Sequence, residues 1–254
     1  GVLVCCLGRA TKLVSHLQAG RKTYAATMVL GRETTTQDAA GEVVRETDAS
    51  GIDEHALCVA LTRFQGEIAQ VPPMVSAVRV DGERLHEKAR RGETVERDAR
   101  TVTVHELVLE DFTPGPLAEA SFLVTCSAGT YVRTLAADVG AELGVGGSLT
   151  RLRRVANGGF TVDVAVPLDE VRAAGEEDRL EALLIPPREA VRGIPEVEVD
   201  DPDQLLALAQ GKRLPAFGQD DRYVIVSGDR LVGVYRDRDG RAESELVWLR
   251  PEEL

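Results

Sequence analysis

The chain has few of the features that would indicate a metal, a disulfide framework or a membrane. Its four cysteines form no Cys-x-x-Cys pair and its four histidines show no ligand spacing, so we predict no metal. Cys6, Cys58 and Cys126 lie in apolar patterns and are predicted to be buried free thiols of a reducing cytosol. No apolar run has the length of a membrane span, and the apolar start has no basic lead-in of a signal peptide. We therefore expect a cytoplasmic protein without a membrane partner.

Positive charge is also scarce. Thirty lysines and arginines face 42 acidic residues, and the net charge of −12 argues against a general polyanion binder. The charge is uneven, because residues 1–24 hold four basic side chains and no acid, whereas residues 175–203 hold ten acids and three arginines. An acidic protein can still bind RNA if its basic side chains share one face. The composition therefore allows an RNA partner without proving one.

The first half of the chain alternates strand and helix patterns. Residues 1–7 are predicted to be a buried strand, and the apolar spacing over 10–17 predicts a helix that ends at Gly20. A strand is expected over 22–31 and an amphipathic helix over 53–64. Further along, we predict a turn at Asp81-Gly82, a short helix over Leu85–Arg91 and a strand over 102–109.

A strand-to-helix junction near residue 129 carries the clearest chemical signal. Alternating apolar residues over 120–126 predict a strand, Gly129 permits a sharp turn, and a helical pattern follows over 132–143. A phenol, Tyr131, and a guanidinium, Arg133, therefore leave the first turn of a helix. Such a junction can hold a planar, polar substrate, but Tyr131 can equally pack in the core and Arg133 can form a surface ion pair.

The composition changes after a basic strand pattern. Three arginines in residues 151–154 alternate with apolar side chains, which fits a phosphate track or an exposed strand equally well. Beyond about residue 165 an acidic stretch with prolines leads to a short helix and strands at 223–226, 231–235 and 246–249. We predict a main domain over 1–175, an acidic, proline-containing linker over 176–194 and a small β-rich domain over 195–254.

Six stretches in this order resemble the TruB family of tRNA pseudouridine synthases. They are Gly1-Val2-Leu3 with Leu7 to Lys12, Lys22-x-Tyr24, Leu30-Gly31 with Thr34 to Gly41, Gln70 to Ala77, Cys126 to Thr134, and Leu152-Arg153-Arg154. Each stretch is weak alone, and their order over about 150 residues carries the resemblance. It implies an α+β fold with a mixed, largely antiparallel sheet and flanking helices, and residues from about 195 are similar in character to an RNA-binding domain of the PUA type.

The resemblance also implies a reaction and a set of site residues. The family converts uridine 55 in the T loop of tRNA to pseudouridine without metal or cofactor, through base flipping and an aspartate nucleophile. We expect the T arm of tRNA as the partner and a monomeric protein. Tyr24 matches the active-site tyrosine, Arg133 matches the arginine that pairs with the nucleophile, and Tyr131 and Leu152 match residues that line the uracil site.

Other positions match family residues with less defined roles. Lys12, Arg153 and Arg154 are expected to contact the RNA backbone, which positions RNA without specifying sequence. Asp38 matches a carboxylate in the threonine-rich loop, and we place it among the substrate-binding residues without a committed role. Nothing in the sequence places it against Arg133.

The match departs from the family pattern at its start. The nucleophile lies in a Gly-x-x-Asp-Pro-x-Ala-x-Gly-Val-Leu pattern, and only the last three residues are present, as Gly1 to Leu3. We therefore expect the printed chain to be inactive but able to bind tRNA in part, and the protein to be an active enzyme where that aspartate is supplied. Two alternatives stay open: a non-catalytic tRNA-binding or tRNA-folding module, and a guide-RNA-dependent pseudouridine synthase. Ala128, Val75 and His86 replace other residues of the family and put local RNA contacts in doubt.

Overall fold

The computed structural model describes residues 1–76, 79–80, 83–84, 91 and 95–254. The chain forms two compact units: residues 1–3 with 19–157, and residues 4–18 with 158–254. Among the described residues, no helix is long and apolar enough to cross a membrane. The predicted turn at Asp81-Gly82, the predicted helix over Leu85–Arg91 and the substitution at His86 lie outside the part of the chain that is described, although Arg91 itself is included.

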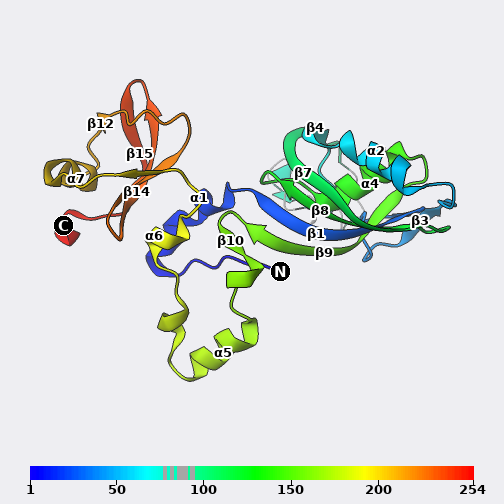
Figure 1. The fold of residues 1–254 in the computed structure, drawn as a ribbon, viewed down its shortest axis with the longest axis horizontal. Helices are drawn as coiled ribbons and strands as arrows, with labels where there is room; N and C mark the ends of the chain where they lie inside the picture. The colour runs from blue at the N-terminus through cyan, green and yellow to red at the C-terminus, as the bar shows by residue number, and fades with distance from the viewer. Residues whose placement is uncertain (77–78, 81–82, 85–90, 92–94) are drawn as a thin grey trace. The chain divides into compact units, whose positions relative to one another are not determined.

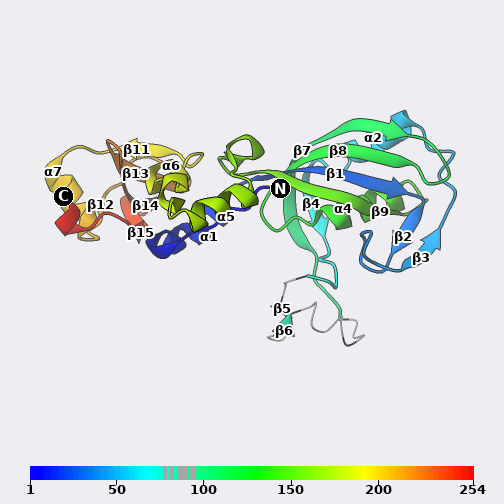
Figure 2. The same ribbon diagram turned by 90° about the horizontal axis from the view of Figure 1, so that it is seen from below.

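The first unit contains an antiparallel sheet built around β1. Its strands lie in the order β9-β1-β8-β7-β4, and each neighbouring pair is antiparallel. Their bounds are β1 Lys22–Leu30, β4 Gly66–Gln70, β7 Arg100–Thr113, β8 Glu119–Cys126 and β9 Gly147–Asn157. The short strands β2 (Arg32–Thr34) and β3 (Val43–Glu46) form a hairpin that continues from β1 (Figure 2).

Two helices pack on one face of this sheet. Helix α2 (Glu54–Thr62) and helix α4 (Val132–Glu142) bury apolar side chains against alternate residues of β1 and β8, such as Met28 and Phe122 (Figure 1). The alternation explains this arrangement. A strand in which every second residue is apolar has one apolar face, and the two helices cover that face. Both helices and the strands over 22–31, 102–109 and 120–126 were predicted from this periodicity and are confirmed.

The second unit contains a separate sheet with the order β11-β13-β14-β15-β12. Its strands are β11 Glu196–Glu198, β12 Leu214–Pro215, β13 Tyr223–Ser227, β14 Arg230–Arg238 and β15 Arg241–Val247. β11 and β13 are parallel and the other pairs are antiparallel. Helix α7 (Pro202–Ala209) packs against this sheet, with its Leu205 and Leu208 in one core cluster beside Tyr223 and Tyr235.

A second core cluster in this unit includes a residue from near the start of the chain. Leu13, at the end of the 3₁₀ helix η1 (Gly8–Leu13), is fully buried beside Val191, Val224 and Leu231. Helix α1 (Val14–Gln18) follows η1, so residues 10–17 are helical as predicted, in two helical types. The segment before the first sheet therefore contributes to the core of the unit formed by the end of the chain.

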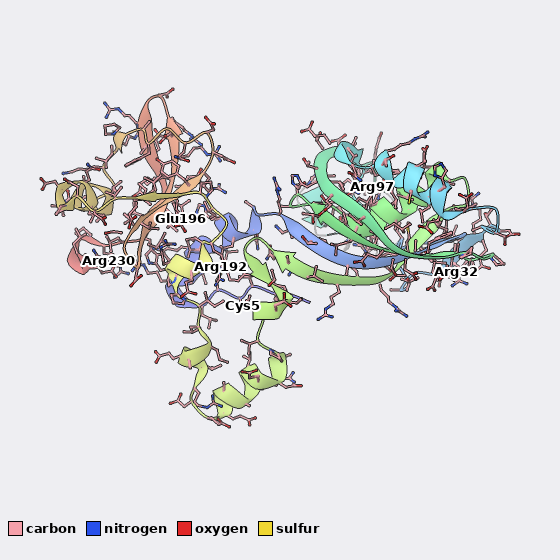
Figure 3. All side chains as sticks on the ribbon, in the orientation of Figure 1. Cys5, Arg32, Arg97, Arg192, Glu196 and Arg230 are labelled. Carbon is pink, nitrogen blue, oxygen red and sulfur yellow. The ribbon has the colours of Figure 1, made fainter. Side chains whose placement is uncertain are left out.

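Short helical segments connect β9 to the second sheet. They are the 3₁₀ helix η2 (Val162–Val164), α5 (Leu168–Glu176), the 3₁₀ helix η3 (Leu180–Leu183) and α6 (Pro187–Ala190), preceded by β10 (Phe160–Thr161). Arg192 follows α6 and lies over the ring of Phe160, with 5.7 Å from its guanidinium carbon to the ring centroid (Figure 3). The remaining elements are β5 (Arg79–Val80), β6 (Glu83–Arg84) and η4 (Pro251–Glu253). The domain boundaries at 175 and 195 stay predictions.

The predicted fold class is confirmed: a mixed α+β arrangement with a large antiparallel sheet, flanking helices and a β-rich C-terminal unit. Three local predictions were wrong. Residues 1–7 form no strand, and although Val2 is buried, Leu3 and Leu7 are exposed. Three cysteines were predicted to be buried. Cys126 is buried, whereas Cys6 and Cys58 are half-buried. The last strand is β15, which begins five residues earlier than predicted because it pairs with β14 from Gly233 to Arg238.

Candidate active site

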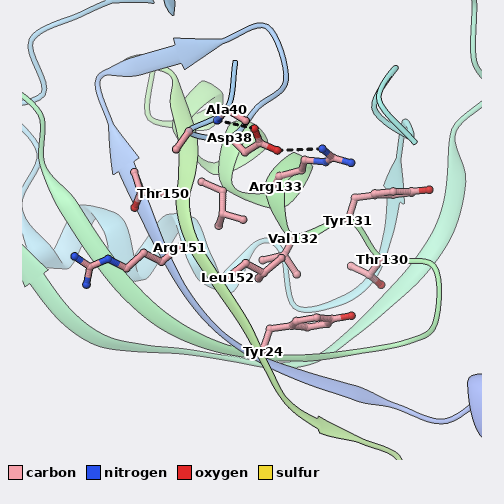
Figure 4. A pocket seen from close by; sticks show the side chains of 12 residues that line it. Tyr24, Asp38, Ala40, Thr130, Tyr131, Val132, Arg133, Thr150, Arg151 and Leu152 are labelled. Atoms are coloured by element: carbon pink, nitrogen blue, oxygen red, sulfur yellow. Dashed lines mark hydrogen bonds and ion pairs between the residues drawn. The ribbon is translucent and has the colours of Figure 1, made fainter. Parts of the chain in front are cut away.

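A pocket of about 390 Å³ lies in the first unit where four segments meet. The segments are β1, the loop between β2 and β3, the start of α4 with the residues just before it, and β9 (Figure 4). Its lining residues are Tyr24, Asp38, Ala39, Ala40, Thr130, Tyr131, Val132, Arg133, Leu149, Thr150, Arg151 and Leu152. The pocket brings together Tyr24, Asp38, Tyr131, Arg133 and Leu152, all of which were predicted as site residues from the sequence.

Asp38 and Arg133 form an ion pair at this pocket. Arg133 Nη1 lies 3.1 Å from Asp38 Oδ2, and both side chains are largely shielded, with 22% and 28% of their surface exposed (Figure 4). The other terminal nitrogen of Arg133 donates to the carbonyl oxygen of Val75. No sequence pattern indicates this contact between Asp38 and Arg133, because the two residues are 95 positions apart and the contact depends on tertiary structure.

The loop itself orients the Asp38 carboxylate. Its Oδ1 accepts hydrogen bonds from the Thr36 hydroxyl and from the backbone N–H of Ala40. Burial acts to raise the pKa of Asp38, but the hydrogen bonds from Thr36, Ala40 and Arg133, with the charge of Arg133, hold that pKa below its ordinary value. Asp38 is therefore an anion at neutral pH. Of the described residues that line the pocket, Asp38 is the one with a carboxylate side chain.

Tyr131 is held through its backbone by a buried glutamine. The side-chain nitrogen of Gln70 donates to the Tyr131 carbonyl at 3.1 Å, and the Gln70 side-chain oxygen accepts from the Tyr131 N–H at 2.7 Å. Gln70 ends β4 and is 1% exposed. Tyr131 precedes the first turn of α4 and has no side-chain cap of its own. Gln70 therefore fixes the start of α4, and with it the direction in which Tyr131 and Arg133 leave the helix.

Tyr24 lies near the start of β1 and is half-buried at the opposite side of the pocket (Figure 4). Arg154 is its direct partner across the β1–β9 pair. Burial raises the pKa of the Tyr24 hydroxyl, and a hydrogen bond from Arg154 opposes that rise without cancelling it. Tyr24 is therefore protonated at neutral pH, and Arg154 is the neighbouring group that favours its anion.

The three consecutive residues Leu152, Arg153 and Arg154 of β9 do not act as one patch. Register pairs Leu152 with Ala26 and Arg153 with Ala25 on β1, and successive strand residues point to opposite faces. Leu152 thus lies on the pocket face, 50% exposed, whereas Arg153 lies on the other face. The Arg154 Nε donates to the Val2 carbonyl at 2.8 Å, so part of its guanidinium is already used within the protein.

Lys12 is exposed on η1, in the second unit, and is not among the residues that line the pocket. The roles of Lys12, Arg153 and Arg154 as backbone contacts stay predictions. Sequence reasoning missed Gln70 as a support for Tyr131, because a buried side chain that binds a remote backbone has no local signature. Arg151, which also lines the pocket, was noted only as part of the basic run.

The arrangement offers surfaces and charged groups suited to a flat, polar ring. A half-buried phenol and the exposed Leu152 offer surfaces for a ring, and the Asp38–Arg133 pair offers charged groups at one side. Within the described ranges no group of three or more histidine, cysteine or acidic side chains could hold a metal ion. The fold and pocket thus define the class of protein: an α+β protein with a pocket on one face of an antiparallel sheet, lined by a phenol, an apolar side chain and an ion pair.

Comparison with known proteins agrees with this class. The model of the TruB family pseudouridylate synthase N-terminal domain matches residues 1–132, and that of the tRNA pseudouridylate synthase B C-terminal domain matches residues 133–192. The chain belongs to the TruB family of pseudouridylate synthases. The family match confirms the resemblance inferred from the six sequence stretches.

Relatives named tRNA pseudouridine synthase B extend over most of the chain. The protein of Burkholderia mallei is 45% identical over 248 residues, which is 94% of this chain and 80% of the relative. The protein of Thermobifida fusca is 40% identical over 254 residues, covering 98% and 84%. The protein of Symbiobacterium thermophilum is 49% identical over 199 residues, 78% of this chain, and the match spans 64% of that relative's length.

A solved structure shows the same fold at lower identity. The structure titled "Crystal Structure of a Cbf5-Nop10-Gar1 Complex" superposes with a TM-score of 0.70 at 23% identity, covering 97% of this chain and 72% of that one. At this identity the likeness extends to the fold alone.

Proposed function

We propose that this protein isomerises uridine 55 in the T loop of tRNA to pseudouridine. The observation that carries the proposal is the pocket in which Tyr24, Leu152 and the Asp38–Arg133 pair meet. Family membership supports the reaction, and the names of the relatives support tRNA as the substrate. Cytoplasmic location and a monomeric state stay predictions.

The reaction requires the target uridine to leave the base stack and enter the pocket. The bond between C1′ of the ribose and N1 of uracil breaks, the base turns, and a bond forms between C1′ and C5. The C5 proton is lost and N1 gains a proton, so the sum is an isomerisation that needs no oxidant and no reductant. We assign Tyr24 to stacking on the base and to moving the C5 proton, with Arg154 beside it to favour the phenolate.

Arg133 and Asp38 supply the charged side of the pocket. In this proposal the guanidinium orients the nucleophilic carboxylate of the family pattern, while Asp38 holds the guanidinium in place. Asp38 itself is not assigned as the nucleophile, since two loop hydrogen bonds and Arg133 already occupy its oxygens. The nucleophile stays the aspartate that the family pattern places five positions before Gly1.

Two other functions compete with this one. A guide-RNA-dependent enzyme would share the catalytic pattern, but the relatives at 40–49% identity are named for tRNA, whereas the structures whose titles name Cbf5, at 22–23% identity, share only the fold. A non-catalytic tRNA-binding module would share the scaffold without needing Tyr24 in the pocket. The specific pocket residues favour the enzyme.

The direct test is a conversion assay on an in vitro transcribed tRNA and on its T-arm hairpin. Pseudouridine is located by carbodiimide modification and primer extension, using the protein purified from its source. We expect a single stop at position 55 in both RNAs, and none in a transcript with cytidine at that position. Conversion only in the presence of added guide RNA, or tRNA binding without product, would overturn the proposal.

The same assay on the 254-residue chain tests the assignment of the nucleophile. We expect tRNA binding by filter retention but no pseudouridine. Product formed by this chain would move the nucleophile to a residue within it, and Asp38→Asn would then be the first variant to examine.

A further inference from the structure

Gln37, next to Asp38, has an unusual backbone conformation. Its φ angle is +63°, in the left-handed region that residues other than glycine seldom adopt. Its N–H donates to the Thr34 carbonyl at 3.1 Å, and its carbonyl accepts from the Leu149 N–H at 3.0 Å. The first bond connects Gln37 to the end of β2, and the second connects the loop to β9. A non-glycine residue in this region persists where the surroundings hold it, and such positions gather at functional sites.

The Gln37 side chain connects the same loop to helix α4. Its side-chain oxygen accepts a hydrogen bond from the Thr134 hydroxyl at 2.9 Å. Thr134 is 3% exposed and directly follows Arg133 on the helix. Two neighbouring residues of the loop thus bind two neighbouring residues of the helix: Gln37 to Thr134, and Asp38 to Arg133.

The two contacts have different effects. Thr36 and the Ala40 N–H fix the Asp38 carboxylate relative to its own loop, but they leave the distance from that loop to α4 undetermined. The ion pair alone cannot set that distance, because a long arginine side chain can follow a displaced carboxylate. The contact from Gln37 to Thr134 is short, and it has a buried partner near the helix backbone.

We propose that Gln37 is a positioning residue, whose bond to Thr134 sets the loop against α4 so that Asp38 meets Arg133. The inference rests on the proposed function for its catalytic meaning. The positioning role itself rests on the loop, the helix and the two contacts between them. The contact between Gln37 and Thr134 forms within the protein itself, and it involves neither the base nor its sugar.

The test measures the Asp38 carboxylate in the 254-residue chain without using catalysis. The carboxyl carbon of Asp38 is titrated by NMR in protein labelled with ¹³C-aspartate, and its signal is assigned by its absence in Asp38→Asn. Thr134→Val removes the donor at nearly constant shape, and Gln37→Met removes the acceptor. We expect the pKa of Asp38 to shift upward in both variants, because the carboxylate moves away from the guanidinium.

Matched variants separate positioning from general damage. Thr134→Ser keeps the hydroxyl and should restore the wild-type titration. Thr62→Val removes a hydroxyl bonded to the Val59 carbonyl on α2, away from the pocket, and should leave Asp38 unchanged. Combining Gln37→Met with Thr134→Val should shift the pKa no further than either change alone, since both remove one bond.

The outcomes for the contact and for the enzyme are distinct. An Asp38 titration that is unchanged in Gln37→Met and Thr134→Val would overturn the proposal, and so would fully additive shifts. Absence of pseudouridine formation by the wild-type protein from its source would overturn the proposed function, while the titration would still decide the role of Gln37. If the Asp38 titration and the pseudouridine assay support both proposals, we expect Thr134→Val to lower kcat by roughly tenfold or more with a smaller change in KM.

Discussion

Arg133 makes two contacts with two different nitrogens of its guanidinium. One terminal nitrogen binds the Asp38 carboxylate and the other binds the Val75 carbonyl. A lysine ammonium has three donors on a single nitrogen and no planar fork, so it cannot reproduce the fixed spacing of these two contacts. In protein that carries the family's aspartate, we expect Arg133→Lys to reduce pseudouridine formation by about 100-fold or more, with tRNA affinity nearly unchanged. Conversion kinetics and filter binding measure the two effects, with Arg63→Lys on the exposed end of α2 as control. Equal losses in both would contradict the assignment.

Asp38 gives a second prediction at this scale, concerning stability and pH. Its folded pKa is lowered, because hydrogen bonds and the Arg133 charge outweigh the opposing effect of burial. A lowered folded pKa contributes stability above the unfolded pKa, and the contribution is lost as pH falls through the folded value. We expect Asp38→Asn to lower the free energy of unfolding of the first unit by about 1–2 kcal/mol at pH 7. The difference should shrink at acidic pH below the ordinary aspartate range.

Urea unfolding of both proteins at pH 7 and in acid checks this dependence. Asp111→Asn, at an exposed position of β7, is the control and should show no comparable difference. A difference between Asp38→Asn and wild type that stays constant over the whole range would count against an ionised Asp38 in the folded protein.

At the scale of elements, the pocket depends on how β4 is joined to α4. The Gln70 side chain satisfies both the N–H and the carbonyl of Tyr131, and it is fully buried while doing so. Gln70→Leu keeps the volume but leaves the Tyr131 N–H without its partner, and it removes one of the two hydrogen bonds to the Tyr131 carbonyl, which also accepts from the Leu135 N–H. We expect a loss of about 1–3 kcal/mol in the free energy of unfolding of the first unit. Gln65→Leu is the control, because Gln65 donates one bond, to the Leu107 carbonyl. An equal cost for both would contradict the double role of Gln70.

The elements themselves were the part that sequence could predict. Alternation over 120–126 and the helical spacing over 132–143 reflect burial on one face, so β8 and α4 appear as expected. Residues 1–7 show the limit, since an apolar run predicts burial, but of these seven described residues only Val2 is buried, and its N–H donates to the Arg154 carbonyl. The Asp38–Arg133 contact could not be predicted from the sequence either, because it also depends on partners that are distant along the chain. It arises from a loop that is fixed by Leu149 and by α4, and no local pattern encodes such partners.

On the scale of the whole molecule, the two units do not follow the order of the chain. Residues 4–18 belong with residues 158–254, and Leu13 is completely buried in a cluster with Val191, Val224 and Leu231. The C-terminal sheet therefore lacks part of its core until the start of the chain has joined it. A substitution near the N-terminus should consequently loosen strands that lie more than 200 residues later.

Leu13→Ala tests this dependence. Truncating a fully buried leucine costs about 2–5 kcal/mol, through lost burial and the cavity that remains. Because the two units can unfold separately, a single unfolding midpoint is a poor measure, and hydrogen exchange read by mass spectrometry is the better one. Amides of β13 and β14 should exchange faster in Leu13→Ala, while those of β1 and β8 keep their protection. Leu206→Ala, at a leucine of α7 that is 41% exposed, should change neither sheet substantially. Faster exchange in both sheets alike would show that Leu13 supports the molecule generally, and unchanged exchange in β13 and β14 would show that the C-terminal core does not depend on it.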